Sequence, residues 1–274
     1  MHRYAVTEMI NKIEAGESFE AVSEAYSFTL KVEKYVPYVC AAIHDGHQFR
    51  KSLWENCTHT AYDRWYEEDP ATLQMIQSHP IVIAGRDSRF EYDLNRPPEE
   101  AVFETAWGKQ LWKTPISAME KAQSLKKHQD FYQVVYALIA KLESLYPKVI
   151  VFDMHSYNWK RWDREVPVWN LGTKNINNDR FGSIAASWST KLEGIGVPYT
   201  STTSRINDTF FGNGHFLKSI TENFENTLVL ATEIAKVYCD ELTGIVFPEV
   251  VKAVEEQLKD LIPLQAREFE ESSC

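Results

Sequence analysis

The chain combines two hydrophobic patterns, short continuous apolar runs and longer segments with helical apolar spacing. The short runs predict buried strands, and they lie at 36–43, 80–84, 90–94, 149–152 and 197–203. Helical spacing covers 8–26, 58–77, 99–111, 116–146, 180–192 and 249–271. Within these segments we expect a break near Asp69-Pro70 and a stop at Pro147, because proline cannot donate a backbone hydrogen bond. Residues 226–233 fit either a strand or a helix.

Strands that alternate with helical segments predict an α/β fold, in which a mostly parallel sheet has helices on both faces. The run Val149-Ile150-Val151-Phe152 suits such a sheet, because a parallel strand is covered on both sides. A length of 274 residues allows one large domain or two small ones. We predict a single domain over 1–274, with a helical N-terminal segment at 1–33 and a helical tail at 249–274.

Composition narrows the functional classes. The formal net charge of −10 argues against a nucleic-acid surface and favours solubility. The N-terminus lacks the apolar region of a signal peptide, and no run approaches 18 apolar residues, so we expect no membrane span. Four scattered cysteines, Cys40, Cys57, Cys239 and Cys274, fit free thiols in a reducing cytosol. We therefore expect a cytoplasmic protein with a small-molecule partner, and the sequence does not indicate an oligomeric state.

Polar side chains follow four of the apolar runs. The four groups are His44-Asp45-Gly46-His47, Asn95-Arg96, Asp153-Met154-His155-Ser156 and Glu233. In open α/β sheets ligands bind outside the carboxyl ends of the strands, so these groups are expected to converge on one edge.

Three protein ligands and an open water position are typical of catalytic zinc. His44 and His47 are three residues apart, and His155 supplies a distant third ligand. Glu68 or Asp69 offers a carboxylate in place of His47. Asp153 either orients His155 by accepting its second ring N–H or serves nearby backbone as a buried acid.

The remaining groups suggest a reaction. Glu233 is the candidate general base, which takes a proton from water and passes it to a leaving amine. The donor fork of Arg96 matches a carboxylate, and Asn95 adds a further donor. The pattern thus points to metal-assisted hydrolysis of an amide in a small substrate with a free carboxylate. Each group also has an ordinary reading: a structural histidine, a helix-face acid, or Arg96 paired with neighbouring glutamates.

Several segments resemble the N-formylglutamate amidohydrolase family, which belongs to the zinc carboxypeptidase-like hydrolases. The similar segments are 43–46 (Ile-His-Asp-Gly), 89–97 (Arg-Phe-Glu-Tyr-Asp-Leu-Asn-Arg-Pro), 152–156 (Phe-Asp-Met-His-Ser), 167–173 (Pro-Val-Trp-Asn-Leu-Gly-Thr), 207–214 (Asn-Asp-Thr-Phe-Phe-Gly-Asn-Gly) and 230–238 (Leu-Ala-Thr-Glu-Ile-Ala-Lys-Val-Tyr). They follow the family's order, and 89–97 is the most specific.

The resemblance implies a three-layer, carboxypeptidase-like α/β sandwich and a zinc-dependent amidohydrolase. It implies His44 and His155 as zinc ligands, Arg96 with Asn95 as carboxylate binders, and Glu233 as general base. For the third ligand, related carboxypeptidases have a glutamate at the position of His47, whereas the formylglutamate enzymes use an acid further on, which corresponds to Glu68 or Asp69. We favour His47 because it is closest in sequence.

Departures from the family pattern bear on the substrate. Ile43 stands where proline is usual, Asp45 replaces a small residue, Thr209 replaces proline, and Lys236 replaces arginine. Three tryptophans, Trp159, Trp162 and Trp169, are expected near the mouth of the site. The expected substrate is thus an N-acylated amino acid with a free carboxylate, N-formyl amino acids included, and the departures argue more against N-formyl-L-glutamate itself than against the hydrolase class. A small-peptide carboxypeptidase and a non-catalytic carboxylate-binding relative are the alternatives.

Overall fold

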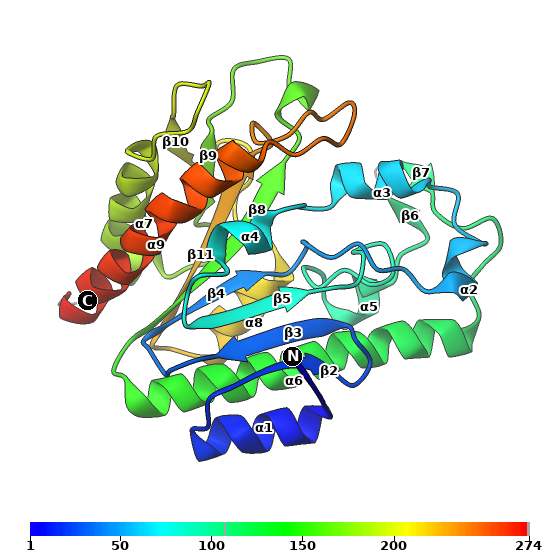
Figure 1. Ribbon diagram of the computed structural model, residues 1–274, viewed down its shortest axis with the longest axis horizontal. Helices are drawn as coiled ribbons and strands as arrows, with labels where there is room; N and C mark the ends of the chain where they lie inside the picture. The colour runs from blue at the N-terminus through cyan, green and yellow to red at the C-terminus, as the bar shows by residue number, and fades with distance from the viewer. Residues whose placement is uncertain (107, 273–274) are drawn as a thin grey trace.

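The computed structural model describes residues 1–106 and 108–272, and a nine-stranded sheet runs through it (Figure 1). The strands of this sheet are β1 (His2–Tyr4), β2 (Phe19–Ser23), β3 (Phe28–Val32), β4 (Tyr38–Ala42), β5 (Ile81–Gly85), β8 (Val149–Tyr157), β9 (Trp169–Gly172), β10 (Ser204–Ile206) and β11 (Thr227–Ala235). Their spatial order is β1-β2-β3-β5-β4-β8-β11-β9-β10. A separate hairpin joins β6 (Thr105–Ala106) to β7 (Lys109–Gln110).

The middle of the sheet is parallel. Strand β4 pairs in parallel with β5 and β8, and β8 pairs in parallel with β11. Strand β3 joins β2 and β5 in antiparallel pairs, and β9 pairs antiparallel with β11. The prediction of a mostly parallel mixed sheet is therefore confirmed, and the carboxyl ends of β4, β8 and β11 meet at one edge.

Helices cover both faces of the sheet, which confirms the predicted three layers (Figure 1). One face carries α1 (Val6–Ala15), α6 (Ala118–Leu145) and α8 (His215–Asn223), and the other carries α4 (Thr72–Ile76), α7 (Asn178–Glu193) and α9 (Pro248–Glu271). Shorter helical segments are α2 (Lys51–Trp54), α3 (Ala61–Glu67), α5 (Pro98–Ala101) and the 3₁₀ turn η1 (Trp159–Arg161). Capping boxes define the N-termini of two helices: Thr60 pairs with Asp63 at the start of α3, and Ser117 pairs with Glu120 at the start of α6.

Two predictions within the first 100 residues are wrong. The segment 1–33 is not helical throughout, because α1 ends at Gly16, whose left-handed backbone stops the helix, and the chain continues as β2 and β3. The predicted strand at 90–94 is a turn. Apolar Phe90, Tyr92 and Leu94 alternate with Glu91 and Asp93, which is the pattern of a half-buried strand, but all five side chains are buried in the turn.

Two further predictions, in the middle of the chain, are also wrong. Among its described residues, the segment 99–111 holds the end of the short α5 and then the strands β6 and β7, in place of a long helix. The predicted strand at 197–203 is a loop that leads into β10. The helical tail is observed as α9, and Cys274, at the end of the predicted tail, lies outside the described residues.

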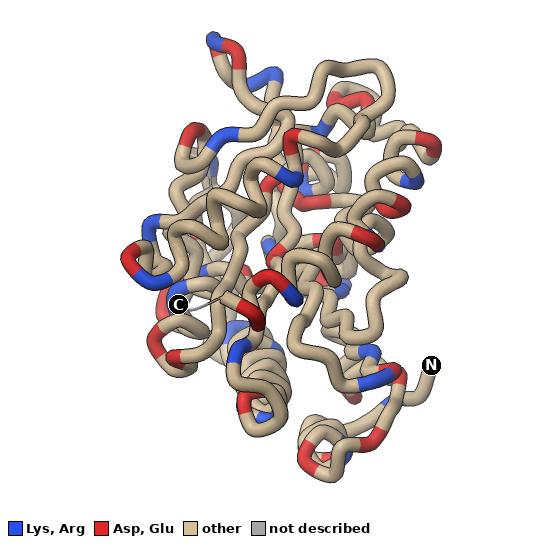
Figure 2. Tube along the Cα trace, turned by 90° about the vertical axis from the view of Figure 1, so that its left-hand side faces the viewer, with Lys and Arg blue, Asp and Glu red and all other residues tan. Residues whose placement is uncertain are grey.

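The charged residues and the cysteines are spread along the chain. Acidic and basic residues are interspersed along the chain in Figure 2, without a block of basic residues in that view. Cys40, Cys57 and Cys239 are buried free thiols. Within residues 1–106 and 108–272, none of the helices combines the length and apolar character that a membrane crossing requires.

Candidate active site

The site is built around the central strand β8. All nine of its side chains are buried, and it continues to Tyr157, five residues beyond the predicted end at Phe152. Asp153 and His155 therefore lie within the strand rather than after it. Because side chains two apart in a strand point to the same face, the two meet, and Oδ2 of Asp153 lies 2.9 Å from Nε2 of His155.

His44 follows β4, the neighbour of β8, and its backbone binds a third segment of the chain. The carbonyl of His44 accepts a hydrogen bond from the backbone N–H of Asp69 at 2.9 Å. Oδ2 of Asp69 then lies 3.4 Å from Nδ1 of His44 and 3.0 Å from Nδ1 of His155. The three side chains are buried, and their candidate ligand atoms lie within 4.8 Å of one another. This His44–Asp69–His155 cluster is the metal-ligand arrangement found within residues 1–106 and 108–272.

In both histidines, His44 and His155, a carboxylate contacts Nε2, the ring nitrogen that points away from Asp69. Nε2 of His44 lies 2.7 Å from Oδ1 of Asp93, and Nε2 of His155 lies 2.9 Å from Oδ2 of Asp153. Burial opposes ionisation of Asp93, but the charges of Arg89 and His44 keep the pKa of that carboxyl well below its usual range. An ionised carboxylate only accepts, so the His44 ring donates from Nε2 and turns its Nδ1 toward Asp69. That Nδ1 is buried and has no hydrogen-bond partner in the described part of the chain.

The cluster also determines the protonation of His155. Burial lowers the pKa of His155, but the charge and hydrogen bond of Asp153 and the hydrogen bond of Asp69 outweigh burial and raise it well above its usual value. The ring is thus held as a cation between two carboxylates when no metal is bound. A metal ion would take the place of the proton on Nδ1.

His47 and Glu68 form a separate pair. Nδ1 of His47 lies 2.6 Å from Oε2 of Glu68, and half of the His47 side chain is exposed. Glu68 ends α3 with extended backbone, and successive side chains in extended backbone point in opposite directions. Glu68 therefore faces His47 while Asp69 faces His44. Of the alternatives that the sequence offered for the third ligand, Asp69 is the one that reaches the two histidines.

Glu233 lies on β11 in register with His155 on β8. Its side chain is partly exposed, in contrast to the buried residues on either side of it. Burial raises the pKa of Glu233 to about 8, against the opposing charge of His155. A carboxyl group with a pKa near neutrality is suited to take and return a proton.

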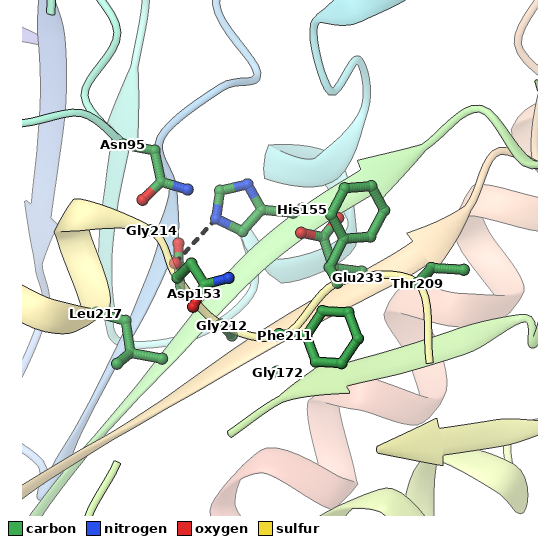
Figure 3. A pocket seen from close by; sticks show the side chains of 13 residues that line it. Asn95, Asp153, His155, Gly172, Thr209, Phe211, Gly212, Gly214, Leu217 and Glu233 are labelled. Atoms are coloured by element: carbon green, nitrogen blue, oxygen red, sulfur yellow. Dashed lines mark hydrogen bonds and ion pairs between the residues drawn. The ribbon is translucent and has the colours of Figure 1, made fainter. Parts of the chain in front are cut away.

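Two adjoining cavities meet at His155 and Glu233. The first cavity, of about 260 Å³, is shown in Figure 3. It is lined by Asn95, Asp153, His155, Gly172, Thr209, Phe210, Phe211, Gly212, Asn213, Gly214, Leu217, Ala231 and Glu233. The second cavity, of about 320 Å³, is lined by His44, Glu67, Asp69, Arg89, Asn95, His155, Ser156, Tyr157, Asn158, Arg161, Trp162, Phe210 and Glu233. Asn95 and Phe210 also line both.

Arg96 lies apart from these cavities. Its guanidinium carbon is 4.5 Å from the centre of the Phe103 ring, and its Nε is 3.6 Å from Oδ2 of Asp93. It is not among the residues that line either cavity, whereas its neighbour Asn95 lines both. Trp169 is also away from the mouth, because it is fully buried in β9. Of the three tryptophans expected there, Trp162 lines the second cavity.

Sequence reasoning gave no role to two residues that support the site, Asp93 and Arg89. Nη2 of Arg89 donates to Oδ2 of Asp93 at 2.8 Å, and Nη1 donates to the carbonyl of Glu67 at 3.2 Å. Arg89 thereby links the carboxylate behind His44 to the segment that carries Asp69. The signal was present in the sequence, because both residues lie in the 89–97 motif, four positions apart.

The chain is similar to a known protein family and to solved structures. The family model for N-formylglutamate amidohydrolase matches residues 36–238. An N-formylglutamate amidohydrolase from Ralstonia eutropha superposes with a TM-score of 0.70 at 15% identity, over 88% of this chain and 98% of that one. A gene product of Agrobacterium tumefaciens superposes with a TM-score of 0.71 at 16% identity, over 89% and 96%. A search of curated protein sequences found no match.

Proposed function

Because the chain belongs to the N-formylglutamate amidohydrolase family, as the match over residues 36–238 establishes, we propose that it is a zinc-dependent hydrolase. Its proposed substrate is an N-acylated amino acid with a free carboxylate, and the bond cleaved is the amide. The observation that carries this proposal is the buried His44–Asp69–His155 cluster beside the partly exposed Glu233.

The donor set fits zinc. Two imidazoles and one carboxylate are a common three-ligand set for catalytic zinc, with a fourth position open to water. The buried, unpartnered Nδ1 of His44 is costly unless a ligand meets it, and a cation would satisfy it. Asp93 and Asp153 supply the carboxylates that orient metal-binding histidines through their second ring nitrogens. Zinc bound there would polarise the amide carbonyl and acidify a water molecule.

The protein's own groups account for the proton transfers. Glu233 takes one proton from the attacking water as the new C–O bond forms. It returns that proton to the amide nitrogen as the C–N bond breaks, which leaves a carboxylic acid and an amine. The remaining proton of the acid then passes to the amine, so the products are a carboxylate and an ammonium ion. The raised pKa of Glu233 favours this exchange near neutral pH. Asn95 lines both cavities and is placed to donate to the substrate.

Metal analysis and a substrate panel test this proposal. Protein purified without an affinity tag is expected to hold about one zinc per chain. It should hydrolyse at least one member of a panel of formyl, acetyl and succinyl amino acids, and Glu233→Gln should lower kcat about 100-fold or more. Glu249→Gln, an exposed acid at the start of α9, is the matched control.

Each alternative has its own outcome in these assays. A near-absence of zinc, with no hydrolysis on adding it, would remove the enzyme proposal. Ligand binding that is equal in the wild type and Glu233→Gln, without turnover in either, would favour a carboxylate-binding protein. A preference for short peptides over every acyl-amino acid would favour a carboxypeptidase-type hydrolase.

A further inference from the structure

The candidate ligand Asp69 has a partner for its second oxygen. Oδ2 faces the two histidines of the cluster, whereas Oδ1 accepts a hydrogen bond from Oγ of Ser156 at 3.3 Å. The hydroxyl of Tyr238 donates in turn to Oγ of Ser156 at 2.9 Å. Tyr238, Ser156 and Asp69 thus form a line of hydrogen bonds, the hydroxyl chain, which leads from the core to the metal-ligand cluster.

The hydroxyl chain joins a loop to the sheet. Asp69 lies in the link between α3 and α4, outside the sheet. Ser156 lies on β8, next to His155, and Tyr238 follows the end of β11. Tyr238 is fully buried, and its carbonyl accepts a hydrogen bond from the backbone N–H of Phe247 at 2.8 Å. The chain therefore fixes a loop residue to two positions that the sheet and the core hold in place.

The hydrogen bonds of the hydroxyl chain run in one direction. A serine hydroxyl has one proton to donate and two lone pairs with which to accept. Ser156 donates its proton to Asp69, so its oxygen is left to accept from Tyr238. Successive hydrogen bonds polarise one another, so the Tyr238 hydroxyl strengthens the bond from Ser156 to the carboxylate. Oδ1 of Asp69 is engaged in this way, and Oδ2 is left for the metal.

The hydroxyl chain completes a pattern within the cluster. Both histidines of the cluster are oriented by buried carboxylates, and the chain supplies the corresponding partner for Asp69, the third candidate ligand. Partners of this kind orient a ligand and raise the affinity for the metal. We propose that Ser156 and Tyr238 are positioning residues, which hold the Asp69 carboxylate so that Oδ2 faces the metal. This inference rests on the proposed function, because it assigns the two hydroxyls a role toward the zinc ion.

Zinc affinity, measured by chelator competition with the metal-free protein, tests the proposal. Ser156→Ala should weaken zinc binding about 10-fold, at the lower end of the range for an orienting partner, because its bond to Asp69 is long. Tyr238→Phe should weaken it by less, about 3-fold, because Tyr238 acts through Ser156. The double variant should bind zinc as weakly as Ser156→Ala alone, since the Tyr238 hydroxyl has no effect on Asp69 once the serine hydroxyl is gone.

Two further variants distinguish positioning from a general loss of structure. Ser156→Thr keeps a hydroxyl at this point of β8 and should restore the zinc affinity of the wild type. Tyr146→Phe is the matched control for Tyr238→Phe, because the Tyr146 hydroxyl donates to the carbonyl of Tyr35, outside the cluster, at 2.8 Å. The proposal is overturned if Ser156→Ala binds zinc within about twofold of the wild type, or if the effects of the two single variants multiply in the double variant.

Crystal structures of the metal-free protein separate this inference from the proposed function. In the wild type, Oδ2 of Asp69 is expected between the two histidine rings, and in Ser156→Ala the carboxylate should rotate away from that position. A rotated carboxylate supports the inference even if the wild type binds no zinc, which would remove the proposed function alone. If the carboxylate keeps its position in Ser156→Ala, Ser156 does not position Asp69, whatever the protein hydrolyses.

Discussion

Oδ1 of Asp93 lies 2.7 Å from Nε2 of His44, and the other oxygen of this carboxylate accepts from Arg89. Asp93 thereby fixes both the tautomer and the orientation of the ring, and it directs Nδ1 of His44 toward Asp69. The same arrangement recurs at His155, where Asp153 is the carboxylate. The two rings thus present their Nδ1 atoms to one point because two buried acids hold them from behind.

Asp93→Asn should weaken zinc binding by about 10- to 100-fold, because the amide removes the charge that favours donation from Nε2. Chelator competition with the metal-free protein measures this affinity. Asp87→Asn is the matched control, since Asp87 is a buried carboxylate that bonds to Tyr92 and Lys127, outside the ligand set. Equal zinc affinity in Asp93→Asn and the wild type would show that the ring needs no support from Asp93.

Glu233 should make the stability of the metal-free protein depend on pH. Burial raises its pKa from 4.5 to about 8, so the folded state holds this proton more tightly than the unfolded state does. The resulting stabilisation is fully present below about pH 4.5 and is lost as the pH rises to about 8. Thermal unfolding of the wild type and Glu233→Gln measures it. The Tm of the wild type relative to the variant should fall over this pH range. If the Tm values of the two proteins change with pH in parallel, the raised pKa of Glu233 is contradicted.

The fold was predictable where hydrophobic pattern and length agree. The long helix α6 falls where the apolar spacing indicates, and the central strand β8 begins where its apolar run begins, although it continues to Tyr157. The errors lie in short segments whose side chains are buried by packing against distant parts of the chain. Phe90, for example, is buried in a turn because a second, small core forms around it, and local sequence carries no trace of that packing.

The candidate site was partly predictable for the same reason. His44, Asp153, His155 and Glu233 lie near strand ends, and the sheet order brings those ends together. The choice between His47, Glu68 and Asp69 depends on which way each side chain points after α3. That direction follows from a backbone hydrogen bond between Asp69 and His44, which the sequence does not encode locally.

Gly172 should be intolerant of a side chain, because a Cβ there would lie 2.3 Å from the backbone nitrogen of Gly212. Gly172→Ala is expected to destabilise the fold by about 1–3 kcal/mol and to displace the loop that lines the first cavity. Gly182→Ala is the control: its nearest atoms lie 4.0 Å away in α7, where alanine should stabilise by about 0.5–1 kcal/mol. Urea unfolding compares them, and equal stabilities would contradict the close approach.

Lys236 should matter more for zinc binding than for stability. Its buried Nζ donates to the carbonyl of Tyr66 at 2.6 Å, and Asn158 donates to the same oxygen at 2.7 Å. Lys236→Met removes a costly buried charge as well as a hydrogen bond, so the free energy of unfolding should change by less than about 1 kcal/mol. Zinc affinity should fall, because the segment that carries Asp69 loses a support. Unchanged affinity in chelator competition would contradict this role.

Anomalous diffraction from zinc-soaked crystals, with data collected on both sides of the zinc absorption edge, tests the proposed metal site most directly. We expect one strong peak bounded by Nδ1 of His44, Oδ2 of Asp69 and Nδ1 of His155. A peak between His47 and Glu68 instead, or no peak at either position, would contradict it.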